Sequence, residues 1–267
     1  MNRIVLPMKV HAVKLEYRRL KLQELPHGYI KEKNGKDYVI ITYDPDNPKV
    51  SSRHNRKVSC STRIGKILSE KINAYQNLKM EYDSLLIDWN SRYRFSPPQV
   101  KFPVKQYFDP HLMNNDYFNK QQDCLGKYIP DNPTISDHGE FKSKNEQMGA
   151  DLLKQIGIPF KYETEIYLDS IKQTINPDYL VNFYEIDRCA YLEILGMNDQ
   201  IDYSVRTATK ITGFSLEKYR PGKEIIYIHV YDKNNFDEDY FISQVLSAFN
   251  DMIPDDALIW DTQEKAV

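Results

Sequence analysis

The sequence predicts an α/β protein in which helices flank a mixed β-sheet, preceded by a three-stranded β-meander and a long helix. Three observations predict this. Strand-like and helix-like segments alternate through the second half of the chain, an Asn-Gly pair separates two β-rich runs near residue 35, and apolar residues recur at helical spacing from about residue 62 to 93. The chain has 267 residues, 41% of them hydrophobic, so a sizeable core can form.

The first predicted element is the antiparallel meander, within residues 29–58. Asn34-Gly35 tolerates positive φ and suits a two-residue hairpin turn between Tyr29–Lys33 and Asp37–Tyr43. A turn rich in Asp and Pro then leads to Val50–His54, which can pair back as a third strand. Three strands with one apolar face need a partner to pack on, and the helix that follows is a suitable cover.

That helix is predicted for residues 62–93 as an amphipathic element of about 30 residues, roughly 45 Å long. Four of its residues are spaced seven apart, as in a coiled-coil seam: Leu68, Tyr75, Tyr82 and Trp89. A homodimer through this helix is one interpretation. Because aromatic residues fit a two-stranded coil poorly, packing of the helix within the chain is at least equally expected.

The remaining chain divides into a connector and a second domain. Residues 96–138 contain six prolines and no sustained period, which predicts a Pro-rich connector after the basic N-terminal region (1–61) and the helix (62–95). Residues 139–267 are predicted to form the α/β domain with an acidic tail. Its expected helices are 144–156, 199–219 and 239–250, and its expected strands are 161–168, 179–184, 188–195 and 224–231.

Composition excludes several classes of protein. The cysteines Cys60, Cys124 and Cys189 are odd in number and far apart, which excludes a disulfide scaffold or zinc ribbon. No signal peptide or membrane-spanning run is recognisable, and no Gly-rich phosphate loop is present. We therefore expect a cytoplasmic protein with no membrane partner.

Three acidic residues stand out by position. Asp178 precedes an apolar strand, and Glu193 lies inside the apolar run of the next strand. If these strands form a hairpin, the two carboxylates meet, and facing carboxylates raise each other's pKa unless a divalent cation neutralises them. Oxygen-only ligation suits Mg²⁺ or Mn²⁺. Glu146, one turn into the helix at 144–156, is a candidate third carboxylate.

The order of these elements resembles the PD-(D/E)xK nuclease superfamily, which has a restriction-endonuclease-like mixed sheet flanked by helices. Three segments carry the likeness: Ser143-Lys144-Asn145-Glu146, Pro177-Asp178 and Leu192-Glu193. A bacterial and phage group of nuclease-like proteins is more narrowly similar in two further segments, Leu25-Pro26-His27-Gly28 with Asn34-Gly35-Lys36-Asp37-Tyr38, and Glu193-Ile194-Leu195-Gly196-Met197. The resemblance covers roughly residues 25–95 and 140–250.

The resemblance implies metal-dependent hydrolysis of phosphodiester bonds, with Asp178, Glu193 and Glu146 binding Mg²⁺ or Mn²⁺. The superfamily places a Lys two residues after the Glu, where this chain has Leu195. Lys210 in the following helical segment is the preferred substitute, with Lys144 and Lys161 behind it. Taken singly, each acid also has a plain structural interpretation: a turn residue for Asp178, an ion-paired edge carboxylate for Glu193 and a helix-dipole acid for Glu146.

Charge is unevenly distributed. Residues 1–95 hold 19 basic and 10 acidic side chains, a net charge of +9, whereas the whole chain carries −2. A three-stranded basic sheet followed by a helix also loosely resembles the arm-type DNA-binding domains of phage integrases. The predicted nucleic-acid contacts are Lys31, Lys33, Lys36, Arg53, Arg56, Lys57, Arg63 and Lys66.

The sequence thus favours a metal-dependent nuclease acting on DNA. Two alternatives stay open: a catalytically decayed protein of the same fold that binds DNA, and an interaction protein that dimerises through the helix at 62–93. In the second alternative the acidic residues are structural.

Overall fold

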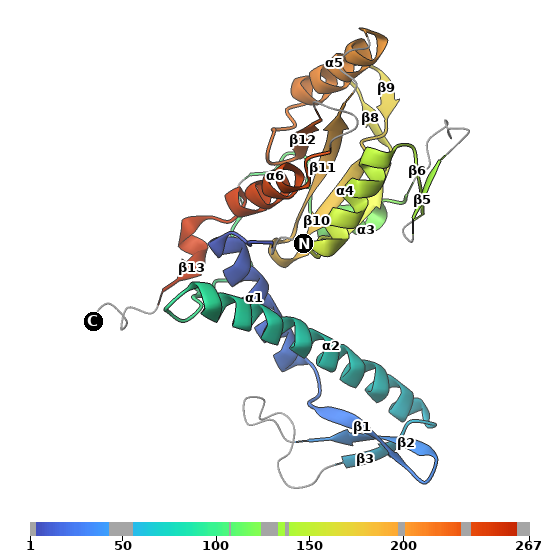
Figure 1. Ribbon diagram of the computed structural model, residues 1–267, viewed down its shortest axis with the longest axis vertical. Coiled ribbons are helices and arrows are strands. Elements are labelled where there is room, and N and C mark those ends of the chain that lie inside the picture. Colours follow the sequence, from blue (N-terminus) through green and yellow to red (C-terminus); the bar gives the residue numbers. More distant parts are fainter. Residues whose placement is uncertain are drawn as a thin grey trace. The chain divides into compact units, whose positions relative to one another are not determined.

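The computed structural model describes residues 4–42, 56–106, 108–123, 133–136, 139–196, 201–230 and 236–260 (Figure 1). The chain divides into two compact units, which we treat separately. The first unit comprises residues 1–10 and 101–257, and the second comprises residues 11–100 and 258–267. The first unit has α/β architecture with open, mixed sheets, as the sequence predicts.

The second unit contains the predicted meander. Strand β1 (Gly28–Lys33) pairs antiparallel with β2 (Lys36–Ile41), and the turn between them puts Asn34 at φ 56° and Gly35 at φ 68°. The third strand that pairs with β2 is β3 (Arg56–Ser59). The predicted strand Val50–His54 lies outside the described residues.

The long helix is confirmed as α2 (Arg63–Arg92), where the side chain of Thr62 caps the N-terminus by accepting the N–H of Gly65 at 2.9 Å. Two residues of the expected coiled-coil seam, Tyr75 and Trp89, are buried within the chain. Tyr75 packs edge-on against His27, and Trp89 packs against His11. These two aromatic positions of the seam therefore serve intrachain packing, which the sequence offered as an alternative to a dimer.

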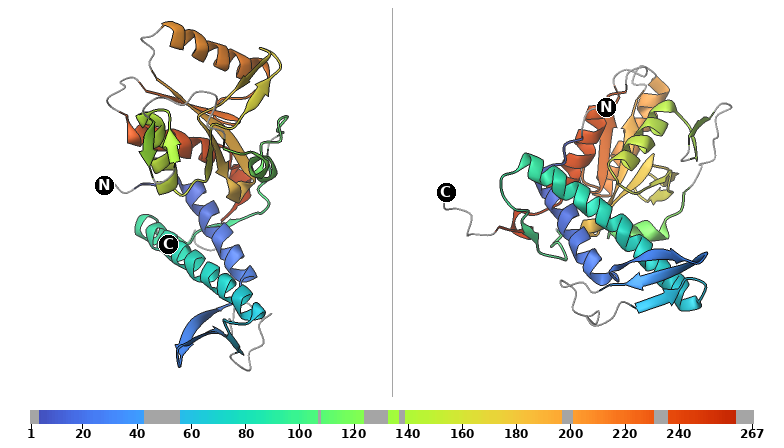
Figure 2. Two further views of the ribbon diagram at one scale, coloured as in Figure 1. Left: turned by 90° about the vertical axis from the view of Figure 1, so that its right-hand side faces the viewer. Right: turned by 60° about the horizontal axis from the view of Figure 1, so that its bottom comes forward.

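A helix that the sequence pattern did not predict precedes the meander. Helix α1 (Met8–Glu24) runs beside α2 from His11 onward (Figure 2). Its buried surface includes polar groups with specific partners: the ring of His11 bonds the carbonyl of Leu85 at 2.8 Å, and Arg18 pairs with Glu81 at 2.9 Å. Because polar residues lie on the buried side of α1, hydrophobic periodicity does not reveal it.

The first unit is built on a four-stranded mixed sheet in the order β12-β11-β10-β7. Strand β10 (Tyr179–Phe183) pairs antiparallel with β7 (Phe160–Tyr162) and β11 (Arg188–Leu195), which pairs in parallel with β12 (Ile225–His229). The antiparallel pairing of β10 and β11 confirms the predicted hairpin, which turns through a short 3-10 segment, Tyr184–Ile186.

Helices cover both faces of this sheet (Figure 1). Helices α4 (Lys144–Gln155) and α6 (Glu238–Asp251) lie on one face, where Phe183 of β10 stacks on Phe249 of α6. Helices α3 (Asn115–Lys120) and α5 (Ile201–Leu216) contribute to the apolar cluster on the other face, where Phe214 packs against Tyr191 of β11. Two short antiparallel pairs complete this unit: β5 (Thr134–Ser136) with β6 (Gly139–Phe141), and β8 (Ile166–Leu168) with β9 (Gln173–Ile175). A third pair, β4 (Gln99–Val100) with β13 (Leu258–Ile259), belongs to the second unit.

One predicted strand, 161–168, is wrong as a single element. It divides into β7 and β8, which belong to different sheets. The break occurs at Glu163, whose backbone adopts the left-handed conformation with φ 48°. A residue in that conformation cannot continue a strand.

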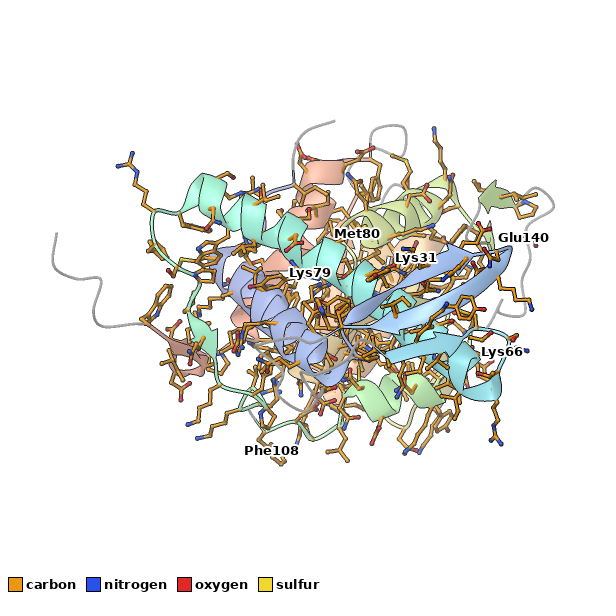
Figure 3. The ribbon with its side chains drawn as sticks, turned by 90° about the horizontal axis from the view of Figure 1, so that it is seen from below. Lys31, Lys66, Lys79, Met80, Phe108 and Glu140 are labelled. Atoms are coloured by element: carbon orange, nitrogen blue, oxygen red, sulfur yellow. The ribbon has the colours of Figure 1, made fainter. Side chains whose placement is uncertain are left out.

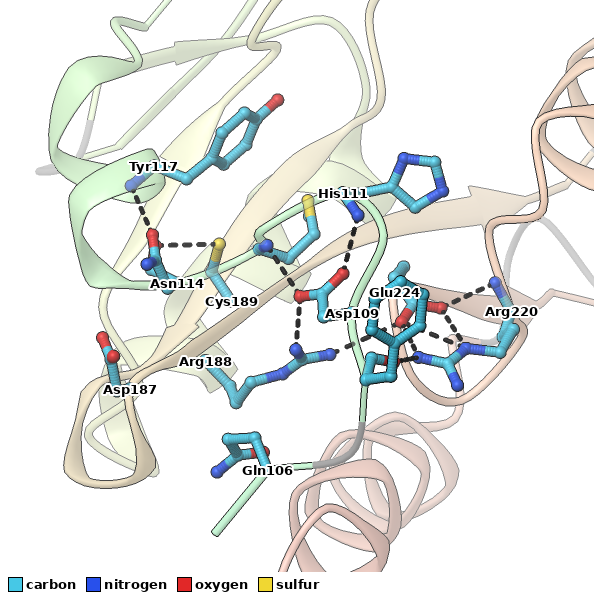
Figure 4. Close-up of polar contacts among 12 residues, drawn as sticks. Gln106, Asp109, His111, Asn114, Tyr117, Asp187, Arg188, Cys189, Arg220 and Glu224 are labelled. Atoms are coloured by element: carbon cyan, nitrogen blue, oxygen red, sulfur yellow. Dashed lines mark hydrogen bonds and ion pairs between the residues drawn. The ribbon is translucent and has the colours of Figure 1, made fainter. Parts of the chain in front are cut away.

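The segment predicted to be a Pro-rich connector packs on the first unit. Its described part from residue 101 onward belongs to the first unit, and Met113 and Phe118 join the apolar cluster. Asp109 accepts the N–H groups of His111 and Met113 and pairs with buried Arg188 of β11 (Figure 4). Arg188 also lies 3.5 Å from Glu224, which in turn pairs with Arg220. These ion pairs and hydrogen bonds fasten the segment to the sheet.

None of the helices in the described part of the chain combines the length and the hydropathy that a bilayer crossing requires.

Candidate functional site

The β10–β11 hairpin brings two of the predicted acids together. Tyr179 lies opposite Leu192, so Asp178 and Glu193 occupy the next pair of positions on the two strands and share one face of the sheet. The backbone N–H of Asp178 donates to Glu193 Oε2 at 3.3 Å, and the N–H of Ile194 donates to Asp178 Oδ2 at 2.6 Å. Asp178 therefore has a strand-end position, and each of the two carboxylates accepts a backbone N–H from the neighbouring strand.

Lys210 places a cation beside Glu193. Position 195, where the resemblance leads us to expect a Lys, is a buried Leu. Lys210 projects from α5, forms an ion pair with Glu193 Oε1 and lies 3.4 Å from the carbonyl of Asn176. Helix α5 lies over the same face of the sheet as Glu193, which explains how a lysine far along the chain reaches the carboxylate. Lys161, a weaker substitute in the sequence, donates to the carbonyl of Gln121 instead.

Burial dominates the electrostatics of the pair. Burial raises the pKa of Asp178 well above its usual value, and the charges of Glu193 and Glu146 raise it further, against the opposing effect of Lys210. Burial likewise raises the pKa of Glu193, although the charge and hydrogen bond of Lys210 oppose the rise. Two carboxyl groups this close do not readily carry two negative charges without another cation.

Glu146, the third predicted acid, lies nearby but its carboxylate is engaged. Ser143 caps α4, and its hydroxyl donates to Glu146 Oε1 at 2.8 Å. The N–H of Lys142 donates to Glu146 Oε2 at 3.2 Å, and the hydroxyl of Tyr162 also donates to that oxygen. Within the described ranges, no group of three or more His, Cys, Asp and Glu side chains is arranged to hold a metal ion. A metal site formed by three carboxylates therefore stays a prediction.

Glu163 is a further acidic residue at this site, and the sequence pattern did not indicate it. Glu163 is buried, with 4% of its surface exposed, and pairs with Lys142 at 2.5 Å. Its other carboxylate oxygen, Oε2, is buried with no hydrogen-bond partner, and burial raises its pKa. The signal in the sequence was weak, because Glu163 falls within a segment predicted to be a continuous strand.

These groups line one cavity of about 430 Å³ in the first unit. Asp178, Glu193 and Lys210 contribute to its wall, as do Glu146, Glu163 and Lys142. Four carboxylates and two lysines thus converge from α4, β10, β11, α5 and the end of β7. Such a cavity can accept a hard cation together with an anionic group that the lysines would neutralise.

The predicted nucleic-acid contacts belong to the second unit. Lys31, Lys33, Lys36 and Lys57 are exposed on the three-stranded sheet, and Arg63 and Lys66 are exposed in the first turn of α2. Lys31 and Lys66 are labelled in Figure 3. Arg53 lies outside the described residues. Arg56 opens β3, but its side chain is not described.

Comparison with known proteins identifies no relative: no protein-family model matches the chain, and no match is found among curated proteins or solved structures.

Proposed function

We propose that the chain is a metal-dependent nuclease of the PD-(D/E)xK type, with a restriction-endonuclease-like core, that hydrolyses phosphodiester bonds in DNA. The observation that carries the proposal is the placement of Asp178 and Glu193 side by side, with Lys210 on Glu193, at one cavity. This is the acid, acid and lysine set that the resemblance implies, with the lysine supplied by a helix. The basic surface of the second unit supports a polyanionic substrate.

The donor set fits a divalent cation. Asp178 and Glu193 are adjacent carboxylates whose pKa values burial raises, so a cation between them would relieve both desolvation and mutual repulsion. Glu163 lines the same cavity, and its buried Oε2 has no hydrogen-bond partner, which also favours a cation there. In this proposal Asp178 and Glu193 would hold Mg²⁺ or Mn²⁺, a cation that prefers oxygen ligands.

When bound, such a cation polarises the phosphoryl group and makes a water molecule more acidic. The chain's own groups do the rest. Asp178 and Glu193 fix the position of the site on a rigid hairpin, which orients the substrate. The ammonium of Lys210 neutralises negative charge that develops on the phosphoryl oxygens. The hydrogen bonds to Glu146 hold its carboxylate beside the pair, where its charge disfavours further anions unless a cation is present.

Incubation of the purified chain with supercoiled and linear DNA tests the proposal, with Mg²⁺, Mn²⁺ or chelator in parallel. We expect cleavage that requires the cation and is lost in Glu193→Gln. The matched control is Glu140→Gln, an exposed acid on β6 outside the cavity, which should cleave as the unaltered chain does. Cation-dependent cleavage that survives both Asp178→Asn and Glu193→Gln would assign the activity elsewhere, and no cleavage with any cation would reject the proposal.

One observation favours a second candidate, the catalytically decayed DNA-binding protein. Lys210 already occupies an oxygen of Glu193, and an ion pair of this kind can be purely structural. Calorimetric titration with Mn²⁺ separates the two candidates, because a decayed site would show no binding that depends on Asp178. A role in dimerisation through α2 would have to use its exposed apolar side chains, such as Ile64, Met80 and Ile87, since the seam aromatics Tyr75 and Trp89 are buried.

A further inference from the structure

The register of the small sheet sorts its side chains onto two contrasting faces. Tyr29 lies opposite Ile40, Lys31 opposite Tyr38, and Lys33 opposite Lys36. On the other edge, Ile40 lies opposite Lys57. Directly paired residues project to the same side of a sheet, and alternate residues along a strand share a side. One face, which we call the basic sheet face, therefore consists of Tyr29, Lys31, Lys33, Lys36, Tyr38, Ile40, Lys57 and Ser59.

The opposite face carries the exposed acids Glu32 and Asp37 beside the turn, and its other described side chains are apolar and covered by α2. Ile30, Val39 and Val58 are paired across the three strands, and Val39 is fully buried. A Cβ atom placed on Gly28 of this face would lie 3.0 Å from a side-chain carbon of Ile72 in α2. The sheet thus has one face for packing, which leaves the basic sheet face as a surface that the core of this unit does not require.

Lysines and tyrosines lie together on the basic sheet face. Among its described positions it carries four lysines and no acidic residue, because Glu32 and Asp37 pair on the other face. Tyr29 exposes 43% of its surface. The ammonium of Lys57 lies 3.7 Å from the centre of the Tyr38 ring, a cation–π contact that holds a positive charge above an aromatic plane. Lys31 of this face is labelled in Figure 3.

We propose that the basic sheet face binds a single strand of nucleic acid, with the lysines contacting phosphates and Tyr29 and Tyr38 stacking on unpaired bases. Lysines alone would suit any polyanion. The exposed ring of Tyr29 and the half-buried ring of Tyr38 among them favour unpaired bases, because each base offers a flat surface to stack on, whereas the bases of a closed duplex are already stacked on one another. The inference deepens the proposed nuclease function by naming the form of nucleic acid, and it concerns a surface in the other unit.

Fluorescence anisotropy of the full chain with a labelled oligothymidine of about 12 nucleotides tests the inference. Chelator is present throughout, so the measurement does not depend on cleavage or on the cation site. Tyr29→Ala should weaken binding by about 5- to 100-fold, the range expected for loss of one stacked base. Tyr29→Phe, which keeps the ring, should bind like the unaltered chain. Lys36→Gln should lower the salt dependence of binding by about 0.7 in the log–log slope.

Matched controls lie off this face. Tyr167 is an exposed tyrosine of β8, and Lys71 is an exposed lysine of α2, so Tyr167→Ala and Lys71→Gln should leave binding unchanged. The inference is overturned if Tyr29→Ala binds as tightly as Tyr167→Ala, or if a blunt duplex of the same length binds as tightly as the single strand. The binding measurement contains no divalent cation, so a chain without nuclease activity can still confirm this inference. Loss of strand binding, in turn, would not contradict the proposed cation site.

Discussion

At the scale of single residues, Lys210 is the side chain on which the proposed function most depends. It is the one lysine paired with Glu193 in the described structure, and it comes from a helix instead of the strand. A lysine on a separate element can neutralise substrate charge, yet it also competes with a cation for the same carboxylate. These two effects predict opposite consequences for catalysis and for cation binding.

The first prediction follows from that competition. Lys210→Met should reduce kcat for DNA cleavage about 100-fold, the scale of losing one charge-stabilising donor. It should also tighten Mn²⁺ binding in calorimetry, because Glu193 loses its internal partner. Lys210→Arg keeps the charge and serves as the comparison. Weaker Mn²⁺ binding in Lys210→Met would contradict the competition.

The second prediction concerns pH and the carboxyl of Asp178, whose pKa is raised in the folded protein by burial and by Glu193 and Glu146. As pH rises above about 4, the unfolded chain releases this proton before the folded chain does. The folded state then binds more protons, so its stability falls with rising pH until the raised pKa is passed. In chelator, Asp178→Asn should therefore gain melting temperature relative to the unaltered chain as pH rises from about 4 to neutrality.

Glu140→Gln is the control for this measurement, since its carboxylate is exposed on β6. It should track the unaltered chain at every pH. If the difference between Asp178→Asn and the unaltered chain stays constant with pH, the folded pKa of Asp178 is not raised.

At the scale of elements, the β10–β11 hairpin both carries the acids and anchors the preceding segment. Asp109, Arg188 and Glu224 form a buried charged cluster (Figure 4). Arg188 lies beside the turn of the hairpin, whereas Asp178 and Glu193 lie at its open end. Burial tends to raise the pKa of Glu224, but its hydrogen bonds and charge interaction with Arg220, together with Arg188, lower it overall. Buried charges that satisfy each other are costly to separate.

The third prediction is a test of that anchor. Arg188→Leu should lower the free energy of unfolding by about 3–5 kcal/mol, because it leaves Asp109 and Glu224 buried without their shared partner. Urea unfolding measures the loss. Lys105→Leu, an exposed residue of the same anchored segment, should change stability by less than about 0.5 kcal/mol. Equal, small effects of the two substitutions would show that the cluster does not hold the segment.

At the scale of the whole molecule, the basic surface and the cavity lined by acidic residues belong to different units. The basic surface lies in the unit of residues 11–100, and the cavity with its acids lies in the unit of residues 101–257. Binding and cleavage should therefore be separable by substitution, because neither set of side chains contributes to the other's fold.

The fourth prediction is a crossed comparison. Glu193→Gln should abolish cleavage and keep the affinity for single-stranded DNA, whereas Lys36→Gln should weaken binding and keep kcat at saturating DNA. Anisotropy and a single-turnover cleavage assay give the two readouts. A Glu193→Gln protein that loses strand affinity would place the binding surface at the cavity instead.

Sequence patterns alone predict the elements that have strong periodicity or turn signals. Asn34-Gly35 specified the hairpin, the spacing of Ile72, Tyr75 and Trp89 specified α2, and two apolar runs specified β10 and β11. The pairing of Asp178 with Glu193 followed from those strands, because the side-chain alternation of a hairpin is fixed once its register is known. Helix α1 is not predicted from the sequence, because its buried side carries polar residues whose partners lie far away in the chain.

The surroundings of the acids follow from contacts that are visible only in the folded chain. Tertiary packing placed Lys210 on Glu193 from a separate helix, and it turned the chain at Glu163 so that a strand became a bend with a buried carboxylate. The fold also showed that the Pro-rich segment is anchored by Arg188, and that the lysines and tyrosines of the meander share a face. Local patterns fix what each segment becomes, whereas contacts between distant segments depend on packing that no single stretch of sequence contains.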